Sequence, residues 1–262
     1  MGALENPVES SVLGFYDPLA EYYHLIFLDW NASIARQARI LNSILAANGC
    51  GPSLRILDCA CGVGTQALGL AQLGHSVVAS DLSPSAVRRA SREAAARGLS
   101  MSFYVADMTT LSEIPDAGFD VVIVMDNALP HLSREDLARA IRAMRSKLNS
   151  HGFLIASIRD YDALAVQRPK MEGPVFYGEE GTRRIVHQVW EWLDQERYRV
   201  HLYMTVRSGE EWVSHHFVGD YRTVQRSEIS AAMAQAGFVN TRWLMPSESG
   251  LYIPLVVGNV SS

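Results

Sequence analysis

The sequence predicts an α/β protein built on one doubly wound parallel sheet, and three observations lead to this fold class. Short apolar segments alternate with amphipathic helical segments from residue 54 to residue 158. The apolar segments are nearly continuous, which is typical of parallel strands that helices cover on both faces. The chain of 262 residues is 48% hydrophobic, which is enough for one large core and excludes a disordered chain.

A helical segment precedes the predicted sheet. From Glu21 to Ala47, apolar side chains recur at spacings of mostly three and four residues, which is the period of an amphipathic helix. The segment 48–52 follows, and it ends the helix because its glycines permit positive φ and its proline cannot continue the hydrogen bonding. We therefore expect residues 15–48 to form an N-terminal helical cap.

The alternating region contains strands separated by helices. Two helix starts carry capping signals, since Ser83 precedes Pro84 and Ser133 precedes a first turn that contains Glu135 and Asp136. The expected strands are Leu54–Cys59, Ser76–Ser80, Ser102–Ala106, Phe119–Met125 and Gly152–Ile158. The expected helices are Thr65–Leu73, Pro84–Arg97 and Arg134–Leu148.

The pattern changes after Asp160, where segments rich in Val, Tyr and Trp predict antiparallel strands. These strands are expected at Arg183–Leu193, Tyr198–Arg207 and Glu211–Val218. The alternation then resumes with a helix at Ser227–Ala236 and strands at Phe238–Leu244 and Tyr252–Val257. Because it resumes, we interpret residues 161–221 as an antiparallel lid insertion within a single domain of residues 1–262.

The composition excludes several classes of protein. Lys and Arg total 23 against 28 Asp and Glu, and the resulting net charge of −5 argues against a general nucleic-acid-binding protein. The first residues lack a secretory signal, and no apolar run approaches the ~18 residues that a membrane span needs. The three cysteines cannot all pair, and Cys59 and Cys61 lie too close for an easy disulfide. We expect a soluble cytoplasmic protein that binds no membrane and no nucleic acid.

The segment from Leu54 to Thr65 carries the most informative motif. A strand ends on Asp58, and small residues with Gly62 and Gly64 then turn the chain into a helix. Open parallel sheets bind ligands outside such strand ends, and glycine lets a ligand approach the backbone closely. The glycine spacing also fits the dinucleotide fingerprint, so NAD binding has to be weighed.

Acidic residues at three successive strand ends favour a different ligand. Asp58 precedes the glycine turn, where its charge repels a pyrophosphate and attracts a cationic amine. Asp81 ends the next strand, where a carboxylate can accept both hydroxyls of a ribose. Asp107 ends the third strand, where it can accept an adenine N–H while Met108 or Leu82 lies against the ring. The three acids together fit a ligand with an amine, a ribose and an adenine but no phosphates.

This arrangement resembles the class I S-adenosylmethionine-dependent methyltransferases, in which the glycine loop and the two later acids bind the cofactor. The resemblance implies S-adenosyl-L-methionine as cofactor. It also implies a Rossmann-like doubly wound seven-stranded sheet of order 3-2-1-4-5-7-6, with strand 7 antiparallel and an antiparallel β insertion after strand 5. The cofactor-binding residues expected around the motif are Asp58, Ala60, Gly62, Gly64, Asp81, Leu82, Asp107, Met108 and Met125.

A closer resemblance, over nearly the whole chain, is to the glycine and glycine/sarcosine N-methyltransferases and their bacterial relatives. It rests on Tyr22-Tyr23-His24 with the later Trp30 and Arg36, on residues 126–132, on residues 159–162 and on the antiparallel insertion. The resemblance implies that aromatic and Arg residues of the N-terminal segment contact the methionine end of the cofactor. These contacts are Tyr23, Trp30 and Arg36, and the expected substrate contacts are Asp126, Asn127, Arg159 and His216.

The expected function is transfer of a methyl group, by in-line SN2 displacement, to a small-molecule acceptor whose reacting atom is nitrogen. A small-molecule O-methyltransferase is the alternative, and an NAD(P)-dependent oxidoreductase is a more remote one. Alignment of the reacting atoms and exclusion of water carry most of this chemistry, so a catalytic base is optional. No metal is expected, and the exposed insertion could pair with a second subunit to form a homo-oligomer.

The candidate catalytic residues are His131, Asp160 and Tyr161. His131 also has a structural interpretation, in which it fixes the loop before the helix that begins near Ser133. Asp160 departs from the glycine-type pattern, which has Asn beside a substrate carboxylate. An Asp repels a carboxylate, so we expect a substrate with an amine, an aromatic N–H or a hydroxyl rather than glycine.

Overall fold

The protein is organised around a sheet whose strand order is that of the predicted doubly wound fold. The computed structural model describes residues 11–179 and 182–261, so the parts of the expected domain at 1–10, 180–181 and 262 lie outside the described residues. The strands lie in the order β10, β11, β5, β4, β1, β2, β3. β11 is antiparallel to both neighbours and the other pairs are parallel, which confirms the prediction. The strands are β1 (Arg55–Asp58), β2 (Ser76–Asp81), β3 (Ser102–Val105), β4 (Phe119–Val124), β5 (Leu148–Ser157), β10 (Phe238–Leu244) and β11 (Leu255–Val260).

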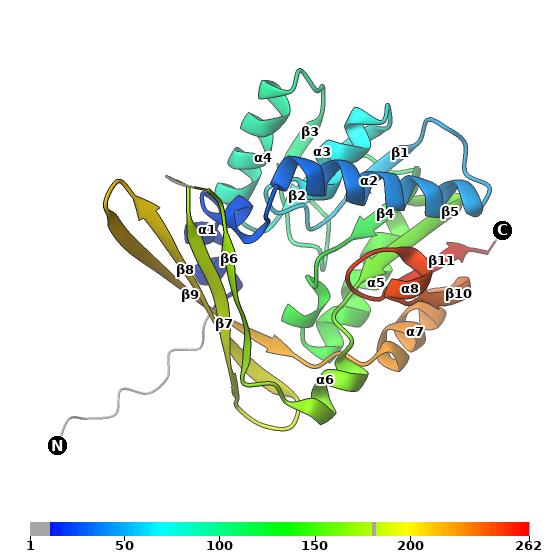
Figure 1. Ribbon diagram of the computed structural model, residues 1–262. Helices are drawn as coiled ribbons and strands as arrows, with labels where there is room; N and C mark the ends of the chain where they lie inside the picture. The colour runs from blue at the N-terminus through cyan, green and yellow to red at the C-terminus, as the bar shows by residue number, and fades with distance from the viewer. Residues whose placement is uncertain (1–10, 180–181, 262) are drawn as a thin grey trace.

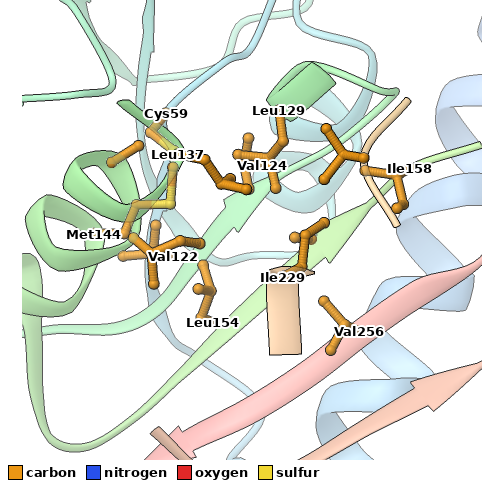
Figure 2. Close-up of a cluster of buried hydrophobic side chains, with 14 of the residues drawn as sticks. Cys59, Val122, Val124, Leu129, Leu137, Met144, Leu154, Ile158, Ile229 and Val256 are labelled. Atoms are coloured by element: carbon orange, nitrogen blue, oxygen red, sulfur yellow. The ribbon is translucent and has the colours of Figure 1, made fainter. Parts of the chain in front are cut away.

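Helices cover both faces of this sheet (Figure 1). The alternation of side chains along β4 divides the core between the faces. Val121 and Ile123 belong to the cluster formed with α2 and α3, whereas Val122 and Val124 belong to the cluster formed with α5 and α7. Figure 2 shows the second cluster. The helices are α2 (Trp30–Ala47), α3 (Thr65–Gln72), α4 (Pro84–Ala96), α5 (Arg134–Lys147) and α7 (Arg226–Gln235).

Two helices begin at the serines that the sequence indicates. The side chain of Ser83 accepts a hydrogen bond from the backbone N–H of Ala86 at the start of α4. The side chain of Ser133 accepts one from the N–H of Asp136 at the start of α5. These caps satisfy backbone donors that a helix leaves free and so fix where the helices begin after β2 and β4.

The antiparallel insertion after β5 is present as a four-stranded sheet of order β6, β7, β8, β9, separate from the main sheet in Figure 1. Its strands are β6 (Met171–Tyr177), β7 (Arg184–Trp192), β8 (Arg197–Ser208) and β9 (Glu211–Arg222). The helix α6 (Tyr161–Gln167) and the strand β6 were not predicted. β6 contains Gly173 and Pro174 and pairs irregularly with β7, so its sequence lacks the alternation that indicates a strand.

Several boundaries differ from the sequence-based expectation. β5 begins at Leu148 rather than Gly152, and β9 ends at Arg222 rather than Val218. The N-terminal segment forms α1 (Val12–Leu19), the short 3₁₀ helix η1 (Tyr23–Ile26) and α2 rather than one helix from Glu21. The helical conformation is interrupted because Phe27 is extended and the side chain of Asp29 caps α2. The last strand begins at Leu255 rather than Tyr252, after the short helix α8 (Pro246–Ser249), since Pro254 cannot donate a ladder hydrogen bond.

The helix α1 joins the insertion to the rest of the molecule, since it packs against both β9 and α4. Phe15 of α1 lies directly against Gly219 of β9. A Cβ added at Gly219 would lie 2.9 Å from the nearest ring atom of Phe15. Through this packing, the N-terminal segment and the insertion meet beyond the end of the main sheet at which β1, β2 and β4 finish.

Among the described helices, none is long and apolar enough to cross a membrane.

Candidate active site

The turn between β1 and α3 forms the floor of the site. Gly62 and Gly64 both have positive φ, +52° and +96°, which glycine adopts without strain. A Cβ built at Gly62 would meet no atom within 4 Å, so the space above this backbone is open. The N–H of Gly62 donates a 2.8 Å hydrogen bond to Oδ2 of Asp81, which ties the turn to the end of β2.

Asp58, at the end of β1, is completely buried. Its Oδ1 accepts a long hydrogen bond of 3.4 Å from the N–H of Ala60, and its Oδ2 has no hydrogen-bond partner among the described residues. Burial, helped by the nearby carboxylates of Asp81 and Asp126, raises the pKa of this carboxyl to about 8. A buried carboxyl with a free oxygen is costly on its own, and a cationic or N–H-bearing ligand would compensate it.

Two further carboxylates follow at the ends of β2 and β3. Oδ1 of Asp81 accepts from the N–H of Ser83 at 2.9 Å, and burial raises the pKa of this side chain. Oδ1 of Asp107 accepts from the N–H of Thr109 at 2.8 Å. The backbone bonds hold both carboxylates in place while lone pairs remain for the hydroxyls or amines of a ligand.

An inner cavity lies above this acidic edge. Most of the residues that the sequence assigned to the cofactor line it, and His131 lines it as well. The assigned cofactor residues in its wall are Tyr23, Ala60, Gly62, Asp81, Leu82, Asp107, Met108 and Met125. Asp58 and Gly64 lie in the turn beside the wall rather than in it. The inner cavity therefore brings together Gly62 of the glycine turn and the acids at the ends of β2 and β3, while Asp58 at the end of β1 lies beside its wall.

An outer cavity adjoins the inner one and is walled by the N-terminal segment, the main sheet edge and the insertion. Eight aromatic side chains line it, together with Arg36, Asn127 and Arg159 from the predicted set. The aromatic residues are Phe15, Tyr16, Tyr23, Phe27, Tyr177, Tyr198, Tyr221 and Tyr252. Tyr16, Tyr23 and Asp126 line both cavities, so these three residues mark the junction.

A strained corner after β4 presents Asp126 at this junction. Asp126 and Asn127 have positive φ, +53° and +68°, which non-glycine residues seldom adopt and which recurs at functional sites. Gln66 donates to Oδ2 of Asp126 at 2.8 Å, and the Tyr252 hydroxyl donates to Oδ1 at 2.5 Å. Burial raises the pKa of Asp126. The carboxyl is thus held in one orientation by groups from α3 and from the chain before β11.

The outer cavity contains a guanidinium that already has an acidic partner. Arg159 donates to Glu172 at 2.7 Å, and its guanidinium carbon lies 4.8 Å from the ring centre of Trp190. The charge of Glu172 raises the pKa of Arg159, although burial opposes this. The backbone N–H of Arg159 donates to Oδ1 of Asn127, so the corner after β4 is hydrogen-bonded to the residue that carries this guanidinium.

Tyr161 lies behind this corner rather than in a cavity wall. It is fully buried, and its hydroxyl contacts Asn127 and lies 2.7 Å from the hydroxyl of Tyr198. Burial raises its pKa, so the phenol keeps its proton. Tyr161 therefore supports Asn127 and Tyr198, which do face the outer cavity.

Besides Asp58, Gly64 and Tyr161, three more predicted site residues lie outside both cavity walls in the described part of the chain. Trp30 is buried and donates to Thr65 at 2.9 Å, which fastens α2 to α3. Oδ1 of Asp160 lies 3.7 Å from Nη2 of Arg226, on the side of α7. His216 stacks on Tyr203 on the outer face of the insertion sheet. The structure does not bring these three side chains together with the rest of the predicted site, because residue type and element do not determine which way a side chain points.

Sequence reasoning missed several residues at the junction. Tyr16, Gln66, Tyr221 and Tyr252 all line a cavity, but they come from four distant parts of the chain. Tyr16 alone had an available signal, because it lies in the aromatic N-terminal segment beside Tyr23. The others meet only through the tertiary fold, for which one sequence contains no spacing signal.

Comparison with known proteins agrees with this geometry. Residues 56–152 match the model of a family described as a methyltransferase domain. The chain is 31% identical over 159 residues to the glycine/sarcosine N-methyltransferase of Parasynechococcus marenigrum, an alignment that covers 58% of this chain and 55% of that protein. It is 30% identical over 138 residues to the 2-heptyl-1-hydroxyquinolin-4(1H)-one methyltransferase of Mycobacteroides abscessus, covering 52% of this chain and 58% of that protein.

These alignments span little more than half the length of the curated relatives. A crystal structure of a S-adenosylmethionine-dependent methyltransferase from Clostridium acetobutylicum superposes with a TM-score of 0.75 at 16% identity, covering 94% of this chain and 99% of that chain. The expected resemblance to S-adenosylmethionine-dependent methyltransferases is thereby confirmed, and the alignment to the glycine/sarcosine N-methyltransferase covers 58% of this chain rather than nearly all of it. Residues 56–152 thus match a methyltransferase domain, and the chain as a whole has the fold of a solved S-adenosylmethionine-dependent methyltransferase.

Proposed function

We propose that the protein transfers a methyl group from S-adenosylmethionine to a small-molecule acceptor, with nitrogen as the acceptor atom. The observation that carries this proposal is the pair of joined cavities. The inner cavity has the glycine turn and the strand-end acids at its edge, and the outer cavity is aromatic and open to a second ligand. The two meet at Tyr16, Tyr23 and Asp126, so reacting atoms bound on either side would face each other there.

The residues of the inner cavity fit this cofactor. The unpartnered Oδ2 of Asp58 is suited to the cationic amine, Asp81 to the ribose hydroxyls and Asp107 to the adenine N–H. Met108 and Leu82 supply apolar surface for the adenine ring. S-adenosylmethionine supplies a methyl group that its sulfonium already activates. The protein then has to orient the acceptor, align it with that methyl group and exclude water.

A dinucleotide fits the same residues poorly. In dinucleotide-binding folds the pyrophosphate accepts hydrogen bonds from the glycine turn and the helix N-terminus. Here the N–H of Gly62 already donates to the Asp81 carboxylate, and the buried Asp58 stands at the start of the turn. That N–H is therefore not free for a pyrophosphate, and the charge of the Asp81 carboxylate repels one, which disfavours the oxidoreductase alternative.

Nitrogen is favoured as the acceptor atom by the outer cavity and by one relative. The relative from Parasynechococcus is named as an N-methyltransferase of glycine and sarcosine. In this chain the guanidinium of Arg159 is already paired with Glu172, so it offers less to a substrate carboxylate than a free arginine would. An amine carried on an apolar or aromatic body fits the ring-lined wall better than glycine does.

An oxygen acceptor is the second candidate, and one observation favours it. The relative from Mycobacteroides is named for a substrate that carries a hydroxyl on a flat ring system. A planar acceptor of that kind also suits the aromatic wall of the outer cavity. The same transfer geometry at the junction serves either atom.

Calorimetry with S-adenosylmethionine, S-adenosylhomocysteine and NADH tests the cofactor assignment. We expect the first two to bind and NADH not to bind, and binding of NADH alone would overturn the proposal. A panel of amines, aromatic N–H compounds, phenols and glycine, assayed by S-adenosylhomocysteine release, then tests the acceptor. Turnover of phenols without turnover of amines would replace nitrogen by oxygen as the acceptor atom.

A further inference from the structure

We infer that Tyr16 is a catalytic residue that takes up the proton lost by the methyl acceptor and passes its own proton to His131. This inference rests on the proposed methyl transfer and adds a route for the proton. Tyr16 lines both cavities, whereas His131 lines the inner cavity directly behind it. The Tyr16 hydroxyl and Nε2 of His131 are 3.0 Å apart.

The other hydrogen bond of His131 determines which residue donates in the hydrogen bond between Tyr16 and His131. Nδ1 of His131 lies 3.1 Å from the backbone carbonyl oxygen of Asp220, and a carbonyl can only accept. Nδ1 therefore carries the proton of a neutral imidazole, and Nε2 is left as an acceptor. The hydroxyl of Tyr16 must then donate to Nε2. Its oxygen keeps lone pairs for other donors, one of which is the Tyr221 hydroxyl at 3.4 Å.

The protonation states at rest agree with this direction. Burial lowers the pKa of His131 to about 4, so the imidazole is neutral at neutral pH and able to receive a proton. Burial raises the pKa of Tyr16 well above its ordinary value, so the phenol keeps its proton until it can exchange it. A protonated imidazole, by contrast, could not receive the proton of Tyr16.

The surroundings of the pair contain few charges that compete for the proton. The rings of Tyr16 and Tyr221 pack against the His131 imidazole, with centroids 5.3 and 4.2 Å away. The carboxylate of Asp220 is already paired with Arg199 at 2.7 Å. On the other side of Tyr16, the phenol of Tyr23 and the carboxyl of Asp81 raise its pKa electrostatically. The aromatic faces can stabilise an imidazolium when it forms.

The proton transfer balances without any further reactant. The acceptor's lone pair forms the new bond to the methyl carbon, and the electrons of the broken carbon–sulfur bond stay on sulfur. The acceptor N–H or O–H proton passes to Oη of Tyr16, and the Tyr16 proton passes to Nε2 of His131. The positive charge that entered with the sulfonium ends on the imidazolium. His131 lines the inner cavity, so water that enters after product release can remove that proton.

Two matched methyl acceptors distinguish proton uptake by Tyr16 from a role of Tyr16 in packing alone. N-methylaniline has one N–H to lose, whereas N,N-dimethylaniline has none, so methylation of the second needs no base. We expect Tyr16→Phe to lower kcat for N-methylaniline by about 10²-fold, a typical general-base effect, and to change kcat for N,N-dimethylaniline by about twofold or less. In His131→Gln the amide oxygen can accept a hydrogen bond from Tyr16 but cannot take up its proton. We expect this variant to show the same losses of kcat as Tyr16→Phe. Tyr203→Phe, on the outer face of the insertion, serves as the control.

Each outcome of this experiment decides a different point. Equal losses of kcat for both anilines, or retained kcat for N-methylaniline in His131→Gln, would overturn the proton route while leaving methyl transfer intact. Absence of S-adenosylmethionine binding to the wild-type protein would overturn the proposed function itself. If neither aniline is methylated, ¹⁵N spectra of the histidines decide the premise: protonated Nδ1 with bare Nε2 at His131 supports the inference, and the reverse tautomer overturns it.

Discussion

The buried carboxyl of Asp58 affects folding as well as binding. In the folded state its pKa is about 8, whereas in the unfolded chain it titrates near its ordinary value of about 3.9. Between these values the folded protein binds more protons than the unfolded chain, so the free energy of unfolding falls as pH rises through this window. At neutral pH the ligand-free site is therefore destabilised, and a cationic amine would relieve the strain.

Asp58→Asn should consequently stabilise the ligand-free protein and weaken cofactor binding. We expect a gain of ~1 kcal/mol at pH 7, seen as a rise in Tm of about 2–4 °C, that becomes smaller towards pH 5. Affinity for S-adenosylmethionine should fall at least ~10-fold, because a charged hydrogen bond is lost. Thermal unfolding at pH 5, 7 and 8 and calorimetry measure both effects. Asp116→Asn, at an exposed position, is the control, and a gain independent of pH would contradict the argument.

The pairing of Arg159 with Glu172 makes a second prediction about a single residue. Glu172→Gln removes the charge 2.7 Å from the guanidinium, so Arg159 becomes available to a substrate carboxylate. Because exposed pairs of this kind contribute up to about 1 kcal/mol, KM for glycine should fall by up to about fivefold, while KM for an uncharged amine changes little. Steady-state kinetics with both acceptors test this. Glu191→Gln, equally exposed on β7, should leave both values unchanged.

Single residues differ in how far sequence can predict their role. Asp58, Asp81 and Asp107 could be assigned to one edge because the ends of neighbouring parallel strands meet there. No such rule applies to Asp160, whose carboxylate faces Arg226 of α7, or to His216, which stacks on Tyr203. The direction of these side chains depends on partners that are distant in the chain and carry no spacing signal.

At the scale of elements, prediction from sequence succeeded where the residues of a segment determine its secondary structure by themselves. The central strands of the main sheet contain short apolar runs such as 121–124, and the capped helices after Ser83 and Ser133 begin where the sequence indicates. It failed where a neighbour imposes the conformation. β6 contains Gly173 and Pro174 and is held as a strand by its pairing with β7, which no local pattern within 171–177 reveals.

At the crossing of α2 and α3, we predict that an alanine destabilises the protein, although helix propensity alone predicts that it stabilises the helix. Gly69 lies inside α3, where alanine normally stabilises a helix by about 1 kcal/mol. Here a Cβ at Gly69 would lie 2.6 Å from Cβ of Ala38 and 2.7 Å from the carbonyl oxygen of Ile34. We expect Gly69→Ala to lower the free energy of unfolding by ~1–3 kcal/mol, measured by urea denaturation. Adding Ala38→Gly should restore part of the loss, and a stabilised Gly69→Ala variant would refute the close crossing.

At the scale of the whole molecule, the site exists only where three parts of the chain meet. The acidic edge belongs to the main sheet, Tyr16 and Tyr23 to the N-terminal segment, and the far wall of the outer cavity to the insertion. The sequence predicts a cap and a lid but not their contact, because the packing of Phe15 on Gly219 joins residues far apart in the chain. A site assembled in this way responds to any change in how the parts are held together.

Arg184 holds two of these parts together and allows that dependence to be tested. From β7 the buried guanidinium donates to the carbonyl oxygens of Leu25 at 2.8 Å and Leu28 at 3.2 Å, and also to that of Phe27. Because η1, which carries Tyr23, overlaps this segment, Arg184→Lys should loosen Tyr23 through the loss of at least one hydrogen bond.

We expect Arg184→Lys to weaken S-adenosylmethionine binding by about 2–10-fold, which corresponds to a loss of 0.5–1.5 kcal/mol, although Arg184 lines neither cavity. Hydrogen exchange should become faster at residues 23–28 and remain unchanged in β1 and β4, and calorimetry measures the affinity. Arg207→Lys, whose side chain bonds only within its own hairpin among the described contacts, is the matched control. Unchanged affinity together with faster exchange at 23–28 would mean that the inner cavity does not depend on the insertion.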